Sequence, residues 1–429
     1  MNLIASLLLG NDNNIEQRNV SWNMAGSFVY ALASMLLTIF AVQFAGEDEG
    51  GIFAFAFSTF GQHMFMVAYY GMRPFHITDI GWQYSFGEYL ALRKRTCLAA
   101  VVICCLYLAF EYAAGTYTPH KCAVIFVMVL YKVIDGYADV YESEFQRNGR
   151  LYLTGKSLTF RTCLSVAAFL CVLIPTGRLL PACLAAVTAQ TAGFLLFDTP
   201  LIPHLPDADC TERQGQTFRL AVENRVLFLS AILDFYVFSA ARYAIDQNMA
   251  DRYQALFAAI FMPTNVINLV AGFVIRPYVT ILSGEWKEGR LSDFLDIVKR
   301  ISLIIAGLTV LAAGAAWFLG IPVLTLLYRK LDYMLADARL PLLLIILGGA
   351  CNAYINLFYY TLVIMDRKPL IFAGYVIASC CAVVISPAAV RRYGIFGGAL
   401  SYVLLMAFLA LFFMGMTFYF YSRRRREDA

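Results

Sequence analysis

Charged side chains are scarce in this chain of 429 residues: they make up 14% of it, whereas 60% of its residues are hydrophobic. Soluble domains carry roughly a quarter charged residues. A water-soluble fold could not bury so much apolar surface, so we expect the bilayer to be the solvent of this chain. The net charge is only +4. The sequence also has no basic stripe and no zinc-ligand spacing, so we predict no nucleic-acid partner.

Sequence motifs of catalysis and nucleotide binding are also missing. The chain has no phosphate-binding P-loop, no Gly-x-Ser-x-Gly, no HExxH and no dinucleotide fingerprint. We therefore predict that it is not an enzyme, that it has no resident cofactor or metal, and that it does not use ATP by itself. The eleven cysteines form no CxxC pair and lie mostly in apolar stretches, where they act as space-filling side chains.

The hydrophobic residues are gathered in long runs. A membrane-spanning helix needs roughly 20 such residues. About twelve spans are predicted near 21–45, 50–71, 96–112, 122–141, 157–176, 179–197, 225–245, 253–280, 301–319, 340–363, 369–388 and 394–421. Residues 320–339 fit this pattern least, because Tyr328-Arg329-Lys330 interrupts an apolar run. The predicted fold class is an all-α polytopic membrane protein.

The basic residues predict the orientation of these spans. If the N-terminus is cytoplasmic, 23 of the 33 lysines and arginines fall in cytoplasmic segments, as the positive-inside rule favours. Both termini of a multi-pass protein are then cytoplasmic. The four arginines at 423–426 form a basic cytoplasmic tail that we expect to contact anionic lipids.

A three-residue signature occurs twice, about half a chain length apart. Arg73-Pro74-Phe75 is predicted to close the second span, and Arg276-Pro277-Tyr278 the eighth. A weak internal repeat of this kind is typical of transporters built from two helix bundles. The linker is predicted at 198–224, where prolines and acids interrupt the apolar pattern. We therefore assign residues 1–205 to an N-lobe of six helices and 206–429 to a C-lobe of six. Because six is even, the two repeats run parallel.

Ionisable residues inside membrane spans are costly, so each one needs a physical reason. The fourth span carries Lys132, Asp135 and Asp139 at positions i, i+3 and i+7, which lie on one face of a helix. Glu142 continues this stripe. Two interpretations remain open: the stripe lines a central polar cavity, or a Lys132–Asp135 pair fixes helix packing.

Asp234 lies well inside the seventh predicted span, with no basic residue within one helical turn. A carboxylate at that depth needs a cation or a proton. We therefore predict either a proton or sodium site at Asp234, or a partner on another helix, with Lys132 as the candidate. Asp135, Asp139 and Asp234 together are the predicted ion-coupling and polar-cavity residues.

Arginines are expected at the inner ends of spans two and eight. A lone arginine there would simply extend to the interface, but Arg73 and Arg276 share the same sequence context. We predict that both shape the cytoplasmic mouth, with Arg161 beside them. Guanidinium groups pair bidentately with phosphate. Arg73, Arg276, Arg161 and Lys132 are therefore the predicted substrate-binding residues, suited to a pyrophosphate.

Two diffuse motifs connect the chain to a known family. Residues 71–79, 84–89 and Arg93 form the first motif, and residues 139–150, 155–157 and Arg161 form the second. Both resemble segments of the polysaccharide flippases, the Wzx-like members of the multidrug/oligosaccharidyl-lipid/polysaccharide (MOP) superfamily. The resemblance covers most of residues 20–200, and over the second half it rests on the span pattern and the repeated signature.

This resemblance implies two six-helix lobes arranged as a V that opens alternately to each side of the membrane. It also implies a substrate, an undecaprenyl-diphosphate-linked oligosaccharide, moved from the inner to the outer leaflet of the bacterial cytoplasmic (inner) membrane for surface polysaccharide synthesis. A polymerase and glycosyltransferases of the same pathway would be partners, and a proton or sodium gradient a source of energy. Two alternatives remain: an ion-coupled exporter of small amphiphiles, and a membrane enzyme that polymerises or transfers the glycan, which the short outer loops disfavour.

Overall fold

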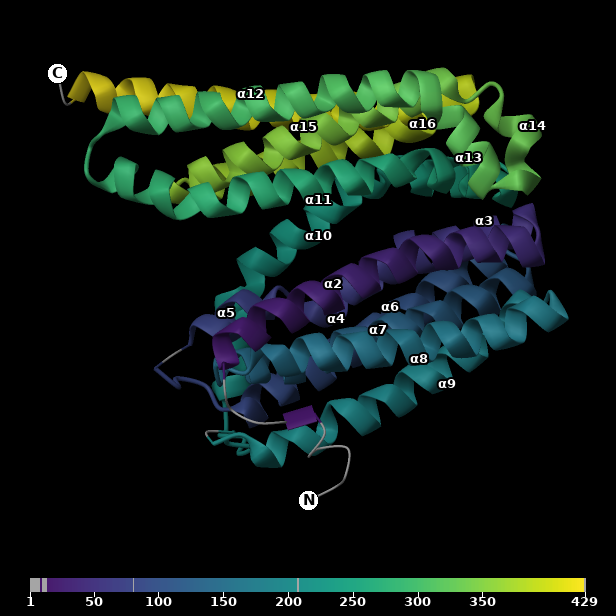
Figure 1. The fold of residues 1–429 in the computed structure, drawn as a ribbon, viewed down its shortest axis with the longest axis horizontal. Helices are drawn as coiled ribbons and strands as arrows, with labels where there is room; N and C mark the ends of the chain where they lie inside the picture. Colours follow the sequence, from purple (N-terminus) through teal and green to yellow (C-terminus); the bar gives the residue numbers. More distant parts are fainter. Residues whose placement is uncertain (1–7, 10–13, 80, 207, 428–429) are drawn as a thin grey trace. The chain divides into compact units, whose positions relative to one another are not determined.

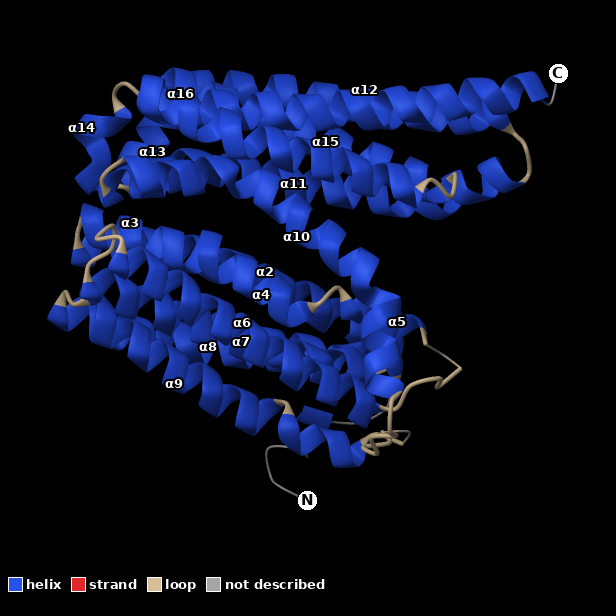
Figure 2. Ribbon diagram, turned by 180° about the vertical axis from the view of Figure 1, so that it is seen from behind, coloured by secondary structure: helices blue, strands red, loops and turns tan. Residues whose placement is uncertain are grey.

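The structure, a computed structural model, describes residues 8–9, 14–79, 81–206 and 208–427, and these residues form helices and loops without a strand. Figures 1 and 2 show the long helices that make up the molecule. Ten helices in the described part are long and apolar enough to cross a membrane. The protein is therefore an all-α, multi-pass membrane protein.

The chain divides into two compact units, Met1–Ile232 and Leu233–Ala429, which we call the N-lobe and the C-lobe. The boundary lies inside helix α10 (Gln216–Asn248), which begins in the N-lobe and ends in the C-lobe. The lobe boundary that the sequence predicted, after residue 205, lies in the segment just before α10.

The helices of the N-lobe follow one another with short connections. They are α2 (Ile15–Phe40), α3 (Glu47–Phe55), α4 (Gly61–Tyr69), α5 (Met72–Thr78), α6 (Phe86–Ala113), α7 (Pro119–Arg147), α8 (Leu151–Thr176), α9 (Leu179–Phe197) and the short 3-10 helix η3 (Thr199–His204). A π turn at Ala56–Phe60 joins α3 to α4. The backbone then leaves the helical region at Tyr70 and Gly71, where φ is 56° and 62°, and α5 starts in a new direction.

Helix α7 is the central helix of the N-lobe and packs against α3, α4, α5, α6, α8 and α9. Its start is well defined, because Pro119 occupies the first turn and the Thr118 hydroxyl accepts a hydrogen bond from the Lys121 N–H. Neighbouring helices cover its charged residues, most of which are buried. A charged helix can therefore lie inside this bundle without exposing its charges to lipid.

Helices α2 and α8 pack closely because glycines face each other where they meet. A Cβ added at Gly26 would lie 2.7 Å from the carbonyl oxygen of Gly155, and one added at Gly155 would overlap the carbonyl of Trp22. Only a residue without a side chain permits two backbones to approach this closely in a membrane bundle.

The segment between η3 and α10 is fastened to the N-lobe. Arg213 donates hydrogen bonds to the buried carboxylate of Glu88 from its Nε (2.7 Å) and from one terminal nitrogen (2.9 Å). These hydrogen bonds raise the pKa of Arg213. The N–H of Gly87 donates to the carbonyl of Asp209 (3.0 Å), and hydrogen bonds from the N–H and hydroxyl of Thr211 lower the pKa of the Asp209 side chain. The predicted linker therefore belongs structurally to the N-lobe.

The C-lobe is built from fewer but longer helices. Besides the end of α10 they are α11 (Asp251–Lys287), α12 (Leu291–Ala315), α13 (Ile321–Leu327), α14 (Asp332–Leu335), α15 (Arg339–Ile364) and α16 (Lys368–Glu427). Helix α15 packs along α11, α12 and α16. The irregular region that the sequence predicted at 320–339 consists of α13, a 3-10 turn and α14.

Helix α16 is 60 residues long because it joins two membrane-length segments across a kink. At Gly394, φ is 56° and ψ is −133°, a conformation that glycine adopts readily and other residues do not. The sequence placed a break between two spans at 389–393, so its position was predicted to within a few residues.

The repeated signature has a different local structure in the two lobes. Arg73-Pro74-Phe75 lies in α5, just beyond the end of α4. Arg276-Pro277-Tyr278 lies inside α11, which continues beyond the proline to Lys287. In the C-lobe the helix therefore continues past the signature, and the proline does not end it. A proline can remain inside a membrane helix, because neighbouring helices and local adjustments satisfy the backbone groups that it frees.

Candidate functional site

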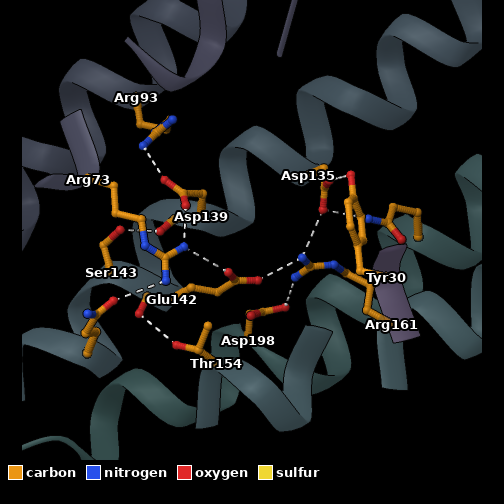
Figure 3. Close-up of polar contacts among 12 residues, drawn as sticks. Tyr30, Arg73, Arg93, Asp135, Asp139, Glu142, Ser143, Thr154, Arg161 and Asp198 are labelled. Atoms are coloured by element: carbon orange, nitrogen blue, oxygen red, sulfur yellow. Dashed lines mark hydrogen bonds and ion pairs between the residues drawn. The ribbon is translucent and has the colours of Figure 1, made fainter. Parts of the chain in front are cut away.

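A group of buried charged residues lies on α7 and the helices around it (Figure 3). We call this group the buried ion network. Its members are four carboxylates, three arginines, a lysine and a tyrosine: Asp135, Asp139, Glu142, Asp198, Arg73, Arg93, Arg161, Lys132 and Tyr30.

Asp139 is held by two arginines from different helices. Arg73 on α5 donates to one carboxylate oxygen (2.6 Å), and Arg93 on α6 donates to the other (2.9 Å). Arg93 is completely buried and also donates to the carbonyl of Ala68 (3.0 Å). Arg73 reaches on to Glu142 (3.4 Å), and its side chain is 24% exposed. Of the three arginines in the network, Arg73 is therefore the partly exposed one.

Arg161 on α8 connects three acids. Its guanidinium lies 3.0 Å from Asp135, 2.9 Å from Glu142 and 2.8 Å from Asp198, which directly follows α9. The arginine is 1% exposed. This side chain joins α7, α8 and the end of α9 through charge-assisted hydrogen bonds, which are the strong class of protein hydrogen bonds.

Lys132 reaches the network through a tyrosine. Its Nζ donates to the hydroxyl of Tyr30 on α2 (3.1 Å), and this hydroxyl donates to Asp135 (2.9 Å). The ammonium group also lies 3.9 Å from the centre of the Phe57 ring, a favourable cation–π distance. A proton could pass between Lys132 and Asp135 through the Tyr30 hydroxyl with little movement of any heavy atom.

The formal charges of the network balance. Four carboxylates face three guanidinium groups and one ammonium group. Burying any one of these charges without a partner would cost several kcal/mol, so the network is stable only as a set. The network is a continuous chain of ionisable groups joined by hydrogen bonds. This chain runs from the partly exposed Arg73 to Lys132, deep in the lobe.

The structure therefore brings together five of the seven predicted site residues, namely Arg73, Arg161, Lys132, Asp135 and Asp139. They do not form an open cationic mouth, because Arg161 is enclosed by carboxylates. A substrate phosphate could bind it only if those contacts opened. Asp135 bonds to Tyr30 and Arg161, and Lys132 reaches it only through Tyr30.

The other two predicted residues belong to the C-lobe. Asp234 on α10 accepts a hydrogen bond from the hydroxyl of Tyr375 on α16. Lys132 and Asp234 thus each have a partner within their own lobe. Arg276 lies in α11, but its side chain falls outside the described residues. The substrate and coupling roles of these residues stay predictions.

Four members of the network were absent from the predicted site: Glu142, which the sequence analysis named only as continuing the stripe on α7, and Arg93, Asp198 and Tyr30. The sequence analysis identified Arg93 only as part of the first motif. Its position two turns into a helix does not indicate that it is buried. Asp198 looked like a soluble loop residue, because it follows the last apolar residue of a span. Tyr30 had no local signal, since a tyrosine in a membrane helix is ordinary.

The two motifs meet in a second buried cluster at one end of the N-lobe. His76 and Glu144 are both fully buried, 2.7 Å apart. Arg147 pairs with Asp79 (3.2 Å), and its guanidinium lies 3.8 Å from the centre of the Trp82 ring. Residues of the first motif therefore bind residues of the second.

No protein-family model matches the chain, and no curated protein matches it. Solved structures do match it over nearly its full length. A multidrug resistance MATE family transporter of the MOP superfamily, in an inward-facing conformation, is 11% identical with a TM-score of 0.70, covering 96% of this chain and 99% of that one.

Two further structures agree. A mutant of the Vibrio cholerae MATE transporter VcmN is 13% identical with a TM-score of 0.57 and covers 99% and 98% of the two chains. The MATE multidrug transporter DinF-BH is 14% identical with a TM-score of 0.57, covering 91% and 93%. The chain therefore has the fold of these MATE transporter structures.

Proposed function

We propose that the protein is a flippase that moves an undecaprenyl-diphosphate-linked oligosaccharide from the inner to the outer leaflet of the bacterial cytoplasmic membrane. The product would supply surface polysaccharide synthesis, with a polymerase and glycosyltransferases as pathway partners. One observation carries the proposal: the motif residues that resemble polysaccharide flippases converge on one another in the N-lobe of a MOP-type transporter fold.

The proposed step uses two lobes that expose a substrate path alternately to each side. An anionic headgroup cannot cross hydrocarbon alone. Arg73, the partly exposed end of the network, would bind the diphosphate in competition with Asp139 and Glu142. Arg276 would act from the C-lobe. A potential negative inside favours outward movement of an anion by about 2.3 kcal/mol per charge per 100 mV.

We also propose how the carrier resets. The Lys132–Tyr30–Asp135 chain would take up or release a proton as the lobes change conformation, and Asp234 with Tyr375 would do so in the C-lobe. Sodium at the same carboxylates is the alternative. A gradient used in this way returns the empty protein to its starting state and need not drive the loaded step.

The topology that goes with this proposal has twelve crossings and both termini in the cytoplasm. Beyond the ten apolar spans it counts α7, whose charges are covered by its neighbours, and it divides α16 into two spans at Gly394.

The test is complementation of a bacterial host that lacks its own flippase. Wild-type protein should restore surface polysaccharide. The double variant Arg73→Ala/Arg276→Ala should reduce it severalfold at equal protein level. Arg95→Ala, which alters an exposed arginine, should restore polymer normally. Full polymer in the double variant would remove the role assigned to these two arginines.

A second candidate is supported by the matched structures, which include multidrug transporters. An exporter of small amphiphiles would lower dye accumulation in a pump-deficient host. A flippase would leave accumulation unchanged. Reduced dye accumulation together with failed complementation would replace the first proposal by the second.

A further inference from the structure

The C-lobe has a basic pocket at the end where α11, α15 and α16 finish. Its volume is about 310 Å³, and its walls include Trp286, Arg367, Phe420, Arg423, Arg424 and Glu427. Trp286 comes from the last turn of α11, Arg367 follows the end of α15, and the others lie in the last turns of α16. In Figure 1 this end of the C-lobe is the one marked by the C-terminus.

The arginines of this pocket differ in whether a carboxylate pairs with them. Arg423 pairs with Glu427 at 2.9 Å, and both side chains are 61% exposed. Arg367 has no carboxylate within ion-pair distance in the part of the chain that the structure describes. Among the described residues that line the pocket, three are arginines and one is a glutamate, so their formal charges sum to a positive value, which suits an anion.

Aromatic rings position two of the arginines. The guanidinium carbon of Arg367 lies 4.3 Å from the centre of the Phe420 ring, and that of Arg424 lies 4.4 Å from the centre of the Trp286 ring. Trp286 itself packs against Phe294 on α12, with ring centres 5.2 Å apart. A guanidinium that rests on a ring face still presents its N–H groups at its edge, the geometry that binds a phosphate bidentately.

The location of the pocket favours a phosphate carried by a lipid. Tryptophan next to the end of a membrane helix is typical of the headgroup level. Earlier in α16, Leu411 and Tyr419 are exposed and could contact lipid chains. We propose that the basic pocket is a binding site for the phosphate of an anionic membrane lipid, with Arg367 and Arg424 as its principal ligands.

The chain offers a matched control for this proposal. Arg425 and Arg426 belong to the same basic tail, but they are exposed and do not line the pocket. If the tail attracted lipid only through its total charge, neutralising these two arginines would have the same effect as neutralising the pocket pair. A built site requires the pocket pair specifically.

The experiment uses full-length protein in nanodiscs that contain phosphatidylglycerol and phosphatidylcholine, released into the gas phase for native mass spectrometry. Wild-type protein should retain phosphatidylglycerol in preference to phosphatidylcholine. Arg367→Gln/Arg424→Gln should lower this retention about tenfold, and Arg425→Gln/Arg426→Gln should leave it within about twofold. Arg367→Lys/Arg424→Lys keeps the charge but loses the planar guanidinium that binds phosphate bidentately. Its phosphatidylglycerol retention should lie between those of the two glutamine variants.

Equal losses in the two glutamine variants would reduce the pocket to part of a diffuse basic tail and overturn the proposal. So would unchanged retention in the pocket variant, or displacement of the lipid by millimolar inorganic phosphate, which would identify a free anion as the ligand. Thermal unfolding of each variant shows whether lost binding reflects lost folding, in which case the lysine variant decides. Because lipid retention is measured without transport, the result is independent of the proposed flippase activity.

Discussion

Arg93 illustrates how a single residue can be essential to this lobe without touching a substrate. It is fully buried between Asp139 and a backbone carbonyl. A buried ion pair adds little net stability when compared with apolar residues of the same size. Breaking it by removal of one partner is nonetheless severe, because a buried charge is left unpaired. Arg95 lies two residues further along the same helix and pairs with Glu212 at the exposed surface.

These two arginines give the first prediction. Arg93→Ala should lower the free energy of unfolding by about 3–5 kcal/mol, and Arg95→Ala by about 0–1 kcal/mol, because solvent screens its ion pair. Both variants remove an arginine from α6, so helix propensity is matched. The comparison is thermal or denaturant unfolding of purified protein in detergent. Equal stability of the two variants would mean that Arg93 is not enclosed as the structure places it.

The hydroxyl of Tyr30 can be tested as a path for protons. Tyr30→Phe keeps a ring beside Lys132 but removes the hydroxyl that links the lysine to Asp135. If a proton passes through this hydroxyl, transport driven by a pH gradient should slow about tenfold. Exchange of substrate without a gradient should be nearly unchanged. Reconstituted vesicles would measure both rates, and a parallel loss of both would show a structural role only.

At the scale of elements, the sequence predicted much of α7 and little of its surroundings. The spacing of Lys132, Asp135 and Asp139 is local, so the charged face followed directly from helix geometry. The partners of this face come from α2, α5, α6 and α8, and their positions depend on how helices rotate against one another. A sequence pattern does not contain those rotations, so the contacts of Arg161 with Asp135 and Glu142 could not be predicted from it.

The packing of α2 against α8 gives a prediction for an element. Gly155→Ala places a methyl group against the backbone of α2, so it should lower the free energy of unfolding by about 1–3 kcal/mol. Gly307→Ala on α12 is the control, because nothing lies within 4 Å of the added Cβ there. It should stabilise its helix by up to about 1 kcal/mol. Unfolding midpoints that move in the same direction would contradict the close approach of α2 and α8.

For the whole molecule, the sequence predicted a two-lobe transporter, and the full-length match to MATE structures supports that architecture. The signature that led to the prediction behaves differently in the two halves: it follows a helix break at Arg73 and lies inside a continuous helix at Arg276. The same three-residue pattern therefore has a different local structure in each lobe. Backbone hydrogen bonding around a proline depends on tertiary neighbours, which the motif does not record.

Helix α7 lies outside the ten apolar spans because of its charges, so its crossing is a prediction about the whole molecule that labelling can test. Cys210, in the segment fastened to the start of α6, serves as a native marker. In a variant that retains only this cysteine, or carries only Thr116→Cys or Arg178→Cys instead, a membrane-impermeant maleimide reports the side of each position. If α6, α7 and α8 all cross, positions 116 and 178 should react from outside intact cells, and Cys210 only after the cells are opened. Opposite labelling of positions 116 and 178 would mean that α7 does not span the membrane.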